Sequence, residues 1–176
     1  MRLFIAINFN ADTKDRLQAL SDELRKVSSR GRYSLRENLH ITLAFLGECG
    51  AERIATVKSV MNEIVFNPFN LQIDRIGRFN RNGGDIWWAG VRKNSTLSEL
   101  HQNLSARLKE QDFYLEARKF SPHITLGREI VTKAQQRQIE PFGKTISRVD
   151  LMKSERINGK LTYTAIYDKE GRAVFR

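Results

Sequence analysis

The tetrapeptide His-Ile-Thr-Leu occurs twice in the chain, at residues 40–43 and again at residues 123–126. In a β-strand successive side chains point to opposite faces, so the histidine and threonine share one face and the isoleucine and leucine the other. Each copy therefore predicts a strand with an apolar side for the core and a polar side whose imidazole and hydroxyl lie roughly 6.6 Å apart. Two such strands, 123 − 40 = 83 residues apart, predict two similar lobes that face each other across a pseudo-twofold axis.

The pattern of apolar residues around the two copies predicts an α+β fold, bilobal, with antiparallel sheets flanked by helices and a central cleft. The first segment is apolar over only about six residues and is followed by an acidic stretch, which favours a buried first strand over a signal peptide. The strands are expected at residues 2–9, 39–47, 69–79, 85–91, 123–131, 145–155 and 161–169, with a short edge strand in 171–176.

Helices are expected between these strands, because leucine, isoleucine and valine recur there at helical spacing. Asp12 can cap the first helix and Ser95 the third, since side-chain oxygens at these positions accept hydrogen bonds from the first turn. The first expected helix runs from Asp12 to a stop within 28–31. The second follows the turn at 47–50, has its apolar face between Ile54 and Val65, and is closed off by Pro68. The third runs from about Ser95 to Gln111, and a short polar helix is expected over 132–139.

Length and composition are those of a soluble domain. The chain has 176 residues, a mass of 20.4 kDa and 28% charged residues, and we expect one domain over residues 1–176 made of two intertwined lobes. No apolar run approaches the roughly 20 residues that a membrane helix needs. The single cysteine, Cys49, allows no internal disulfide and nothing requires an oxidising compartment, so we expect a cytoplasmic protein. A monomer is the default expectation.

The charge of the chain favours anionic partners. The formal net charge is +10 and the pI is about 10.0. Nucleic acid or a phosphorylated small molecule would be attracted by such a surface, although the same charge could serve solubility alone. The basic residues are spread along the chain, so we do not expect a disordered polycationic arm.

Two histidines and two threonines facing one cleft would suit in-line substitution at phosphorus. Of His40 and His123, one imidazole, when neutral, could take a proton from an attacking water, while the other, when protonated, could give one to the departing ribose oxygen. Thr42 and Thr125 could hold the non-bridging phosphate oxygens. The sequence alone leaves open which histidine has which role.

Metal or cofactor chemistry is not expected. A zinc site needs three or four ligands, whereas the third histidine, His101, lies on the third expected helix beside its leucines, and Cys49 has no CxxC partner. Neither a metalloprotease motif nor the GK[ST] end of a phosphate-binding loop is present. We therefore expect no metal and no cofactor.

At this point the chain resembles the two-histidine phosphoesterase superfamily, and more closely the RNA 2′,3′-cyclic phosphodiesterases, also called the 2′-5′ RNA ligase family. The resemblance rests on MRLFIAI at the start, ENLHITLAFLG, GRF followed by IWWAGV, FSPHITLGR, and SRVDLMKSE followed by GKLTYTAIY. These segments span nearly the whole chain, and the paired H-x-T-x motifs with such flanks are specific to the family.

The resemblance implies metal-independent hydrolysis of a ribose 2′,3′-cyclic phosphate at an RNA end, with a 2′-phosphate as product. It implies that His40 is the proton donor to the 3′ oxygen, that His123 is the base that activates water, and that Thr42 and Thr125 hold the phosphate. Formation of a 2′-5′ bond would be the same chemistry in reverse, with a 5′-hydroxyl in place of water.

Phe45 and Arg128 stand five residues after their respective histidines and are candidate substrate-binding residues. An aromatic face and a guanidinium could hold a base between them, and the resemblance points to such contacts. Strict alternation places both on the face opposite the histidines, so a bulge would be needed, which Gly127 would ease for Arg128. Otherwise Phe45 is a core residue. One of Trp87 and Trp88 should be buried and the other should face the cleft.

The stretch before the first motif departs from the family. Many members carry a tryptophan there, whereas this chain has Tyr33, which bears on base stacking but not on the chemistry. Arg36, close to the motif, could either meet phosphates or be solvated.

Two other functions remain open. The same four motif residues would serve a relative that acts on a small nucleotide, such as an ADP-ribose cyclic phosphate or a 2′-5′ oligoadenylate. A non-catalytic RNA-binding protein could keep the fold, although the intact motifs argue against it.

Overall fold

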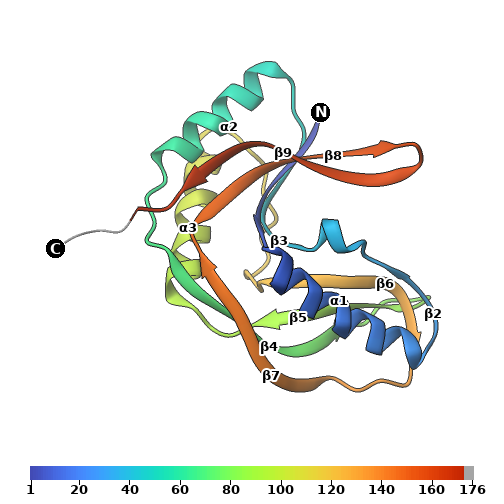
Figure 1. Cartoon of the computed structure of the whole chain (residues 1–176). Helices are drawn as coiled ribbons and strands as arrows, with labels where there is room; N and C mark the ends of the chain where they lie inside the picture. Colours follow the sequence, from blue (N-terminus) through green and yellow to red (C-terminus); the bar gives the residue numbers. More distant parts are fainter. Residues whose placement is uncertain (173–176) are drawn as a thin grey trace.

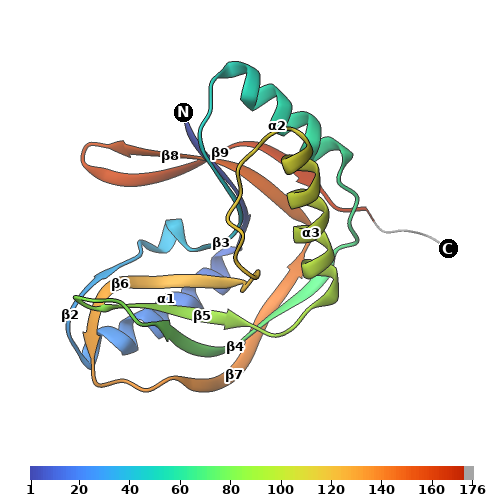
Figure 2. The same cartoon turned by 180° about the vertical axis from the view of Figure 1, so that it is seen from behind.

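The two strands that carry the repeated motif, β3 (His40–Glu48) and β6 (His123–Thr132), lie side by side in the middle of one antiparallel sheet. The computed structural model describes residues 1–172, and in this part of the chain the sheet has nine strands in the order β7-β4-β5-β6-β3-β1-β8-β9, with β2 paired to β6. Figures 1 and 2 show the sheet divided into two lobes that meet at these central strands.

We name the lobes after their histidines. The His40 lobe contains β3 with β1 (Arg2–Asn8), β8 (Arg148–Ile157) and β9 (Lys160–Glu170). The His123 lobe contains β6 with β5 (Asp85–Val91), β4 (Phe69–Phe79), β7 (Arg137–Ile146) and β2 (Ser28–Tyr33). The predicted bilobal α+β fold is confirmed.

Two of the helices, the first and the third α-helix, pack on the lobe opposite to that of the strand that precedes them. Helix α1 (Ala11–Lys26) follows β1 of the His40 lobe but packs on β2, β6 and β7 of the His123 lobe. Helices α2 (Ala51–Glu63) and α3 (Ser95–Glu110) pack against each other, and against β9 and β3 of the His40 lobe respectively (Figure 2). A short 3₁₀ helix, η1 (Arg36–Asn38), leads from β2 into β3.

The expected apolar stripes form the core. The leucines of α3 are all buried, as are Leu17 and Leu24 of α1, and five consecutive residues of β1 are buried on both faces of the sheet. None of the helices within residues 1–172 is long and apolar enough to cross a membrane. The buried residues of the motifs are Ile41, Leu43, Ile124 and Leu126.

Both expected helix caps lie elsewhere. The side chain of Asn10, not Asp12, accepts the hydrogen bond that caps α1, from the Thr13 N–H at 3.0 Å. The side chain of Asn94, not Ser95, does the same for α3, from the Leu97 N–H at 3.0 Å. In each case an asparagine stands one residue before the first helical residue, and asparagine is as strong a cap as serine or aspartate.

The expected short helix over 132–139 is wrong, because β6 continues to Thr132 and β7 begins at Arg137. Its polar residues have good helix propensity, but pairing with β4 overrides that preference, with Ile76 opposite Arg137. The stretch 28–31, expected only to end a helix, opens β2. The single expected strand over 145–155 is interrupted at Ser147, where the chain leaves β7 for β8. Of the expected edge strand, Gly171 and Arg172 are not in a strand, and 173–176 lie outside the described residues.

Candidate active site

The two motifs meet at the boundary between the lobes. Ile41 and Ile124, the second residue of each motif, are antiparallel partners in the pairing of β3 with β6. Both side chains are fully buried, so the neighbouring histidines and threonines lie on the opposite, open side of the sheet. The pseudo-twofold arrangement expected from the repeat is therefore present at the level of the backbone.

A matching bulge follows each motif. The pairing of β1 with β3 shifts between Ile5↔Ala44 and Ala6↔Thr42, and Leu43 and Ala44 are consecutive buried residues. The bulge reverses the alternation, so that Phe45 lies on the histidine side with 48% of its surface exposed.

The second motif repeats this geometry. The pairing of β5 with β6 shifts between Trp87↔Gly127 and Trp88↔Thr125, and Leu126 and Gly127 are consecutive buried residues. Arg128 is thereby exposed on the histidine side. The bulges that substrate contacts by Phe45 and Arg128 would require are present in both lobes.

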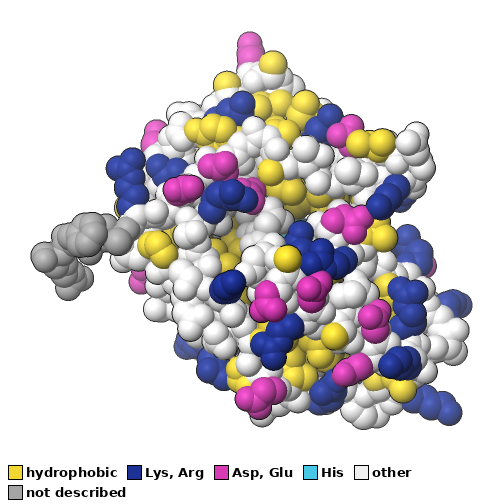
Figure 3. Space-filling model, viewed as in Figure 1, with side chains coloured by type: hydrophobic (Ala, Val, Ile, Leu, Met, Phe, Trp, Pro, Cys, Tyr) yellow, Lys and Arg dark blue, Asp and Glu magenta, His cyan; other side chains and the backbone are white. Residues whose placement is uncertain are grey.

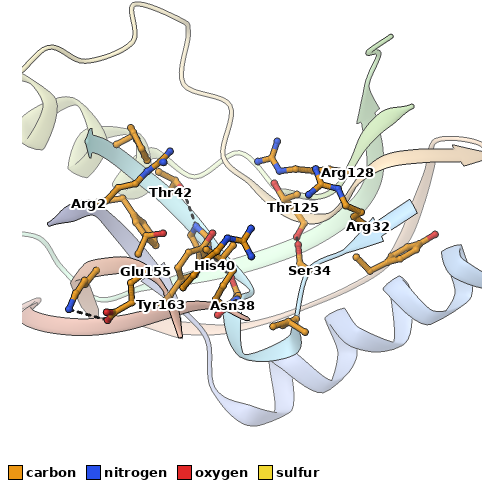
Figure 4. Close-up of a pocket in the computed structure, with 18 of the residues that line it drawn as sticks. Arg2, Arg32, Ser34, Asn38, His40, Thr42, Thr125, Arg128, Glu155 and Tyr163 are labelled. Carbon is orange, nitrogen blue, oxygen red and sulfur yellow. Dashed lines mark hydrogen bonds and ion pairs between the residues drawn. The ribbon is translucent and has the colours of Figure 1, made fainter. Parts of the chain in front are cut away.

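One cavity of about 870 Å³ lies between the lobes (Figure 4). It brings together all six residues singled out from the sequence, three from β3 and three from β6. Those residues are His40, Thr42, Phe45, His123, Thr125 and Arg128.

Backbone carbonyls fix the tautomer of both histidines. His40 Nδ1 lies 2.7 Å from the Asn38 carbonyl oxygen, and His123 Nδ1 lies 2.7 Å from the Ser121 carbonyl oxygen. A carbonyl can only accept, so each Nδ1 carries a proton and each neutral imidazole keeps its lone pair on Nε2. In both motifs the partner stands two residues before the histidine, so the two rings are held in the same way.

The threonines differ in their contacts. The Thr42 hydroxyl lies 2.9 Å from His40 Nε2, so the imidazole and the hydroxyl of the first motif are aligned with each other on the cavity wall. The backbone carbonyl of Thr125 accepts a hydrogen bond from the Ser34 hydroxyl at 2.9 Å, which ties the end of β2 to the second motif. The Thr125 side chain lines the cavity.

Aromatic side chains enclose His40. The His40 ring lies 4.9 Å from that of Phe4, measured between centroids, and 5.3 Å from that of Tyr163, to which it stands edge-on. Neither contact is predictable from the sequence, because Phe4 and Tyr163 come from β1 and β9, far along the chain from the motif.

His123 has a matching pair. Its ring lies 5.1 Å from that of Phe79 and 6.3 Å from that of Trp88. Trp87 is buried in the core, so of the two tryptophans Trp88 is the one on the histidine side of the sheet.

This environment lowers the pKa of both histidines. Burial is the main cause for His40; the Asn38 carbonyl opposes it, and the charge of His123 lowers the pKa of His40 further. For His123 burial again dominates, the Ser121 carbonyl opposes it, and the positive charge of Arg128 adds to the lowering. Without a ligand, both rings are therefore biased toward the neutral form.

Cations surround the cavity. Besides Arg128 it is lined by Arg2, Arg32, Lys153 and Arg156. The sequence does not single these out, because they stand on three different strands, β1, β2 and β8, outside the two motifs. Two acidic residues, Glu48 and Glu155, are also present. Elsewhere Lys and Arg side chains are spread over the surface among acidic ones, as Figure 3 shows for one face.

Two other candidates from the stretch before the first motif behave differently. Arg36 does not line the cavity and is bound to Asp15 at 2.7 Å and to the Ala11 carbonyl, so it is a structural residue. Tyr33 does line the cavity, but Arg25 covers its ring at 4.4 Å.

The residues set aside as metal ligands lie outside the cavity. His101 stacks on Phe120 with centroids 3.7 Å apart, and Cys49 is buried. Among residues 1–172 no three side chains of histidine, cysteine, aspartate or glutamate are grouped so as to hold a metal ion.

The fold and the paired histidines define a two-histidine phosphoesterase. A family model of the 2′-5′ RNA ligase superfamily matches residues 12–158, and the chain belongs to this superfamily. It is 31% identical to the RNA 2′,3′-cyclic phosphodiesterase of Archaeoglobus fulgidus over 82% of this chain and 85% of that one. It is also 31% identical to the Escherichia coli K12 enzyme of the same name, over 73% of this chain and 72% of that one.

Solved structures agree with this assignment. A crystal structure of a phosphoesterase superposes with a TM-score of 0.86 at 25% identity, covering 98% of both chains. E. coli LigT complexed with 3′-AMP superposes with a TM-score of 0.82 at 25% identity, again over 98% of both chains. Both comparisons include the two lobes.

Proposed function

We propose that the protein is an RNA 2′,3′-cyclic phosphodiesterase that opens a terminal 2′,3′-cyclic phosphate to a 2′-phosphate. One observation carries this proposal: the imidazoles of His40 and His123 line the same cavity, and a backbone carbonyl holds each of them in the same tautomer. Several curated relatives at about 30% identity carry this activity as their name, which supports the same reaction here. Both histidines come from one chain, so residues 1–176 acting as a single-domain monomer suffice.

The reaction needs one proton transfer at each imidazole. His123 Nε2 accepts a proton from water as the water oxygen bonds to phosphorus, and protonated His40 donates the Nε2 proton to the 3′ oxygen as its bond to phosphorus breaks. The 2′ oxygen keeps the phosphate, so the product is a 2′-phosphate with a free 3′-hydroxyl. Exchange with solvent then resets both histidines. The resemblance to the family, rather than the near-symmetric geometry, assigns His40 as donor.

The threonines stabilise the charge that develops on the phosphate. Thr42 Oγ1, already beside His40 Nε2, and Thr125 Oγ1 in the opposite lobe donate to the non-bridging oxygens. Phe45 and Arg128 contact the base of the terminal nucleoside. No covalent intermediate is formed.

The proposed chemistry is independent of metal. General acid–base catalysis by two imidazoles and stabilisation by hydroxyls and arginines account for the reaction without a Lewis acid. A 5′-hydroxyl in place of water would attack the same phosphorus, the 3′ oxygen would leave with the proton from His40, and a 2′-5′ bond would form.

A small nucleotide is the second candidate substrate. The structural neighbour LigT from E. coli has been crystallised in complexes with 3′-AMP, ATP and NADP⁺, which supports a small nucleotide as an alternative substrate. The same four motif residues would act on a cyclic phosphate carried by such a molecule.

The test uses a short RNA with a 2′,3′-cyclic phosphate end, incubated with the protein in EDTA, and resolves the 2′- and 3′-phosphate products. We expect the 2′-phosphate alone. Abolition by EDTA with recovery on adding a divalent metal would contradict the metal-free mechanism. An intact cyclic end would contradict the RNA proposal and leave a small cyclic phosphate or a binding role.

A further inference from the structure

Two arginines of the cavity stand directly opposite each other. Arg32 of β2 and Arg128 of β6 are antiparallel partners, and both line the cavity. Figure 4 shows their side chains next to each other, across the cavity from Arg2 and His40. Like charges at directly opposed positions of a sheet are destabilising, so this arrangement costs stability unless an anion lies between the two guanidinium groups.

A strained glutamate holds one of the two arginines. Glu129 has a φ of 54°, in the left-handed region that glutamate rarely adopts. Its carboxylate lies 2.8 Å from Arg32 Nε. The ion pair uses Nε of Arg32, and the two terminal amino groups of Arg32 bond no other residue within residues 1–172. Both partners are more than half exposed, so the pair adds little to stability and its effect is to orient the guanidinium.

The second arginine has no such partner. Arg128 forms no ion pair with any residue in the described part of the chain. Its charge nevertheless reaches the reaction centre, because it lowers the pKa of both His40 and His123. It lies three residues beyond Thr125 on the same strand, roughly 10 Å away in an extended chain.

The backbone fixes these two arginines relative to the motif. Just after Arg32, the Ser34 N–H donates to the Leu126 carbonyl at 2.9 Å and the Ser34 hydroxyl donates to the Thr125 carbonyl at 2.9 Å. The end of β2 is therefore bonded to the residues that carry the phosphate-binding hydroxyl. A group held by Arg32 and Arg128 would sit at a fixed distance from the reacting phosphorus.

We propose that Arg32 and Arg128 form a second phosphate subsite, which takes the phosphate on the 5′ side of the terminal nucleoside. Guanidinium groups suit this ligand, because their planar forks match phosphate oxygens with two parallel hydrogen bonds. The edge of the Arg128 guanidinium can donate hydrogen bonds to this phosphate while its face stacks on the base. The preferred substrate is then the end of an RNA strand, not an isolated nucleoside cyclic phosphate. This inference rests on the proposed function.

The experiment compares kcat/KM for three substrates: adenosine 2′,3′-cyclic phosphate, its 5′-phosphorylated form, and the dinucleotide ApA with a 2′,3′-cyclic end. For Arg32→Ala we expect the preference for the dinucleotide over the nucleoside to fall about tenfold. The slope of log kcat/KM for the dinucleotide against log salt should become shallower by roughly 0.7, one phosphate contact.

Arg30→Ala is the matched control. Arg30 stands on the same strand and carries the same charge, but it bonds the Gly83 carbonyl and does not line the cavity. We expect wild-type preference and salt slope from it. If Arg30→Ala and Arg32→Ala changed the substrate preference and the salt slope equally, the effect would come from the overall charge of the protein, and the subsite would be overturned.

Other outcomes separate the subsite from the proposed function. Hydrolysis of all three substrates at equal kcat/KM by wild type would overturn the subsite and leave the function standing. If Arg32→Ala lowered kcat/KM for the 5′-phosphorylated nucleoside alone and not for the dinucleotide, the assignment of the subsite to an RNA strand would be overturned. If no substrate is hydrolysed, calorimetry still tests the subsite: adenosine 2′,5′-bisphosphate should bind more tightly than adenosine 2′-phosphate, and Arg32→Ala should remove the difference.

Discussion

Ile41 and Ile124 pair across the boundary between the lobes, and each stands between the histidine and the threonine of its own motif. The distance between the His40–Thr42 and His123–Thr125 pairs therefore depends on one buried backbone contact and on the packing of two fully buried isoleucines. Both the stability of the fold and the proposed activity should therefore depend on these two isoleucines.

Truncation of this pair should destabilise the fold. Ile124→Ala removes buried methyl groups and leaves a cavity, which typically costs about 2–5 kcal/mol in the free energy of unfolding, whereas Ile124→Val costs about 1 kcal/mol. Ile157→Ala, at the exposed end of β8, should change the stability by less than about 0.5 kcal/mol. Denaturant unfolding measures all three, and equal stability of Ile124→Ala and wild type would disprove the structural role.

The pH profile of kcat/KM should be bell-shaped, with its maximum below pH 6.5. One histidine must be neutral and the other protonated, and burial lowers the pKa of both from the ordinary value of 6.5. The acidic limb is then the loss of the neutral base, and the alkaline limb is the loss of the protonated donor.

Bound substrate should move this profile. The negative phosphate favours protonated imidazoles, so the profile of kcat should lie at higher pH than that of kcat/KM. Rates from pH 4.5 to 9 measure both. A rate that rises steadily to alkaline pH, with no second limb, would be incompatible with a histidine acid.

Asn38 should be a positioning residue for His40. Its carbonyl accepts the His40 Nδ1 proton, and its buried side chain donates from Nδ2 to the Leu161 carbonyl of β9 at 2.9 Å. Asn38→Ala removes the donor to the Leu161 carbonyl, and with it a bond that holds the turn before β3 in place. We expect a loss of about 1–3 kcal/mol in stability.

The readout specific to positioning is the tautomer of His40, seen in the imidazole ¹⁵N chemical shifts. Wild type should show the proton on Nδ1, whereas Asn38→Ala should show a mixture together with a lower kcat. Ser121→Ala is the control: it too keeps the carbonyl that binds its histidine, but the Ser121 side chain forms no hydrogen bond with the described residues, so its loss frees nothing. An unchanged His40 tautomer in Asn38→Ala would contradict the role.

Glu129→Gly should separate stability from specificity. Glycine relieves the left-handed backbone at this position, which should stabilise the fold by about 1 kcal/mol. The same change frees Arg32 and should lower the preference for a 5′-phosphate. Thermal unfolding and the substrate comparison test the two parts, and a stabler variant with undiminished preference would show that Glu129 has no part in the subsite.

The sequence predicted the centre of the site because its residues are close together in the chain. His40 with Thr42, and His123 with Thr125, are each two residues apart on one strand, so alternation alone places them on one face. The need for a bulge before Phe45 and Arg128 also followed from alternation, and both bulges are present.

The rest of the site depends on pairing over long distances. Phe4 and Tyr163 reach His40, and Arg32 meets Arg128, only because of the strand order of the sheet. The error over 132–139 has the same origin, since the partner that makes this segment a strand is β4, about sixty residues earlier. Local patterns carry no information on such partners.

The central claim is that His40 and His123 act as one acid–base pair. The direct measurement is the single-turnover rate of cyclic phosphate opening for wild type, His40→Ala, His123→Ala and the double variant, with circular dichroism to verify the fold. We expect each single change to lower the rate at least about 10²-fold, and the double variant to be no slower than the slower single variant. Losses that multiply in the double variant, or a single variant at the wild-type rate, would contradict the paired mechanism.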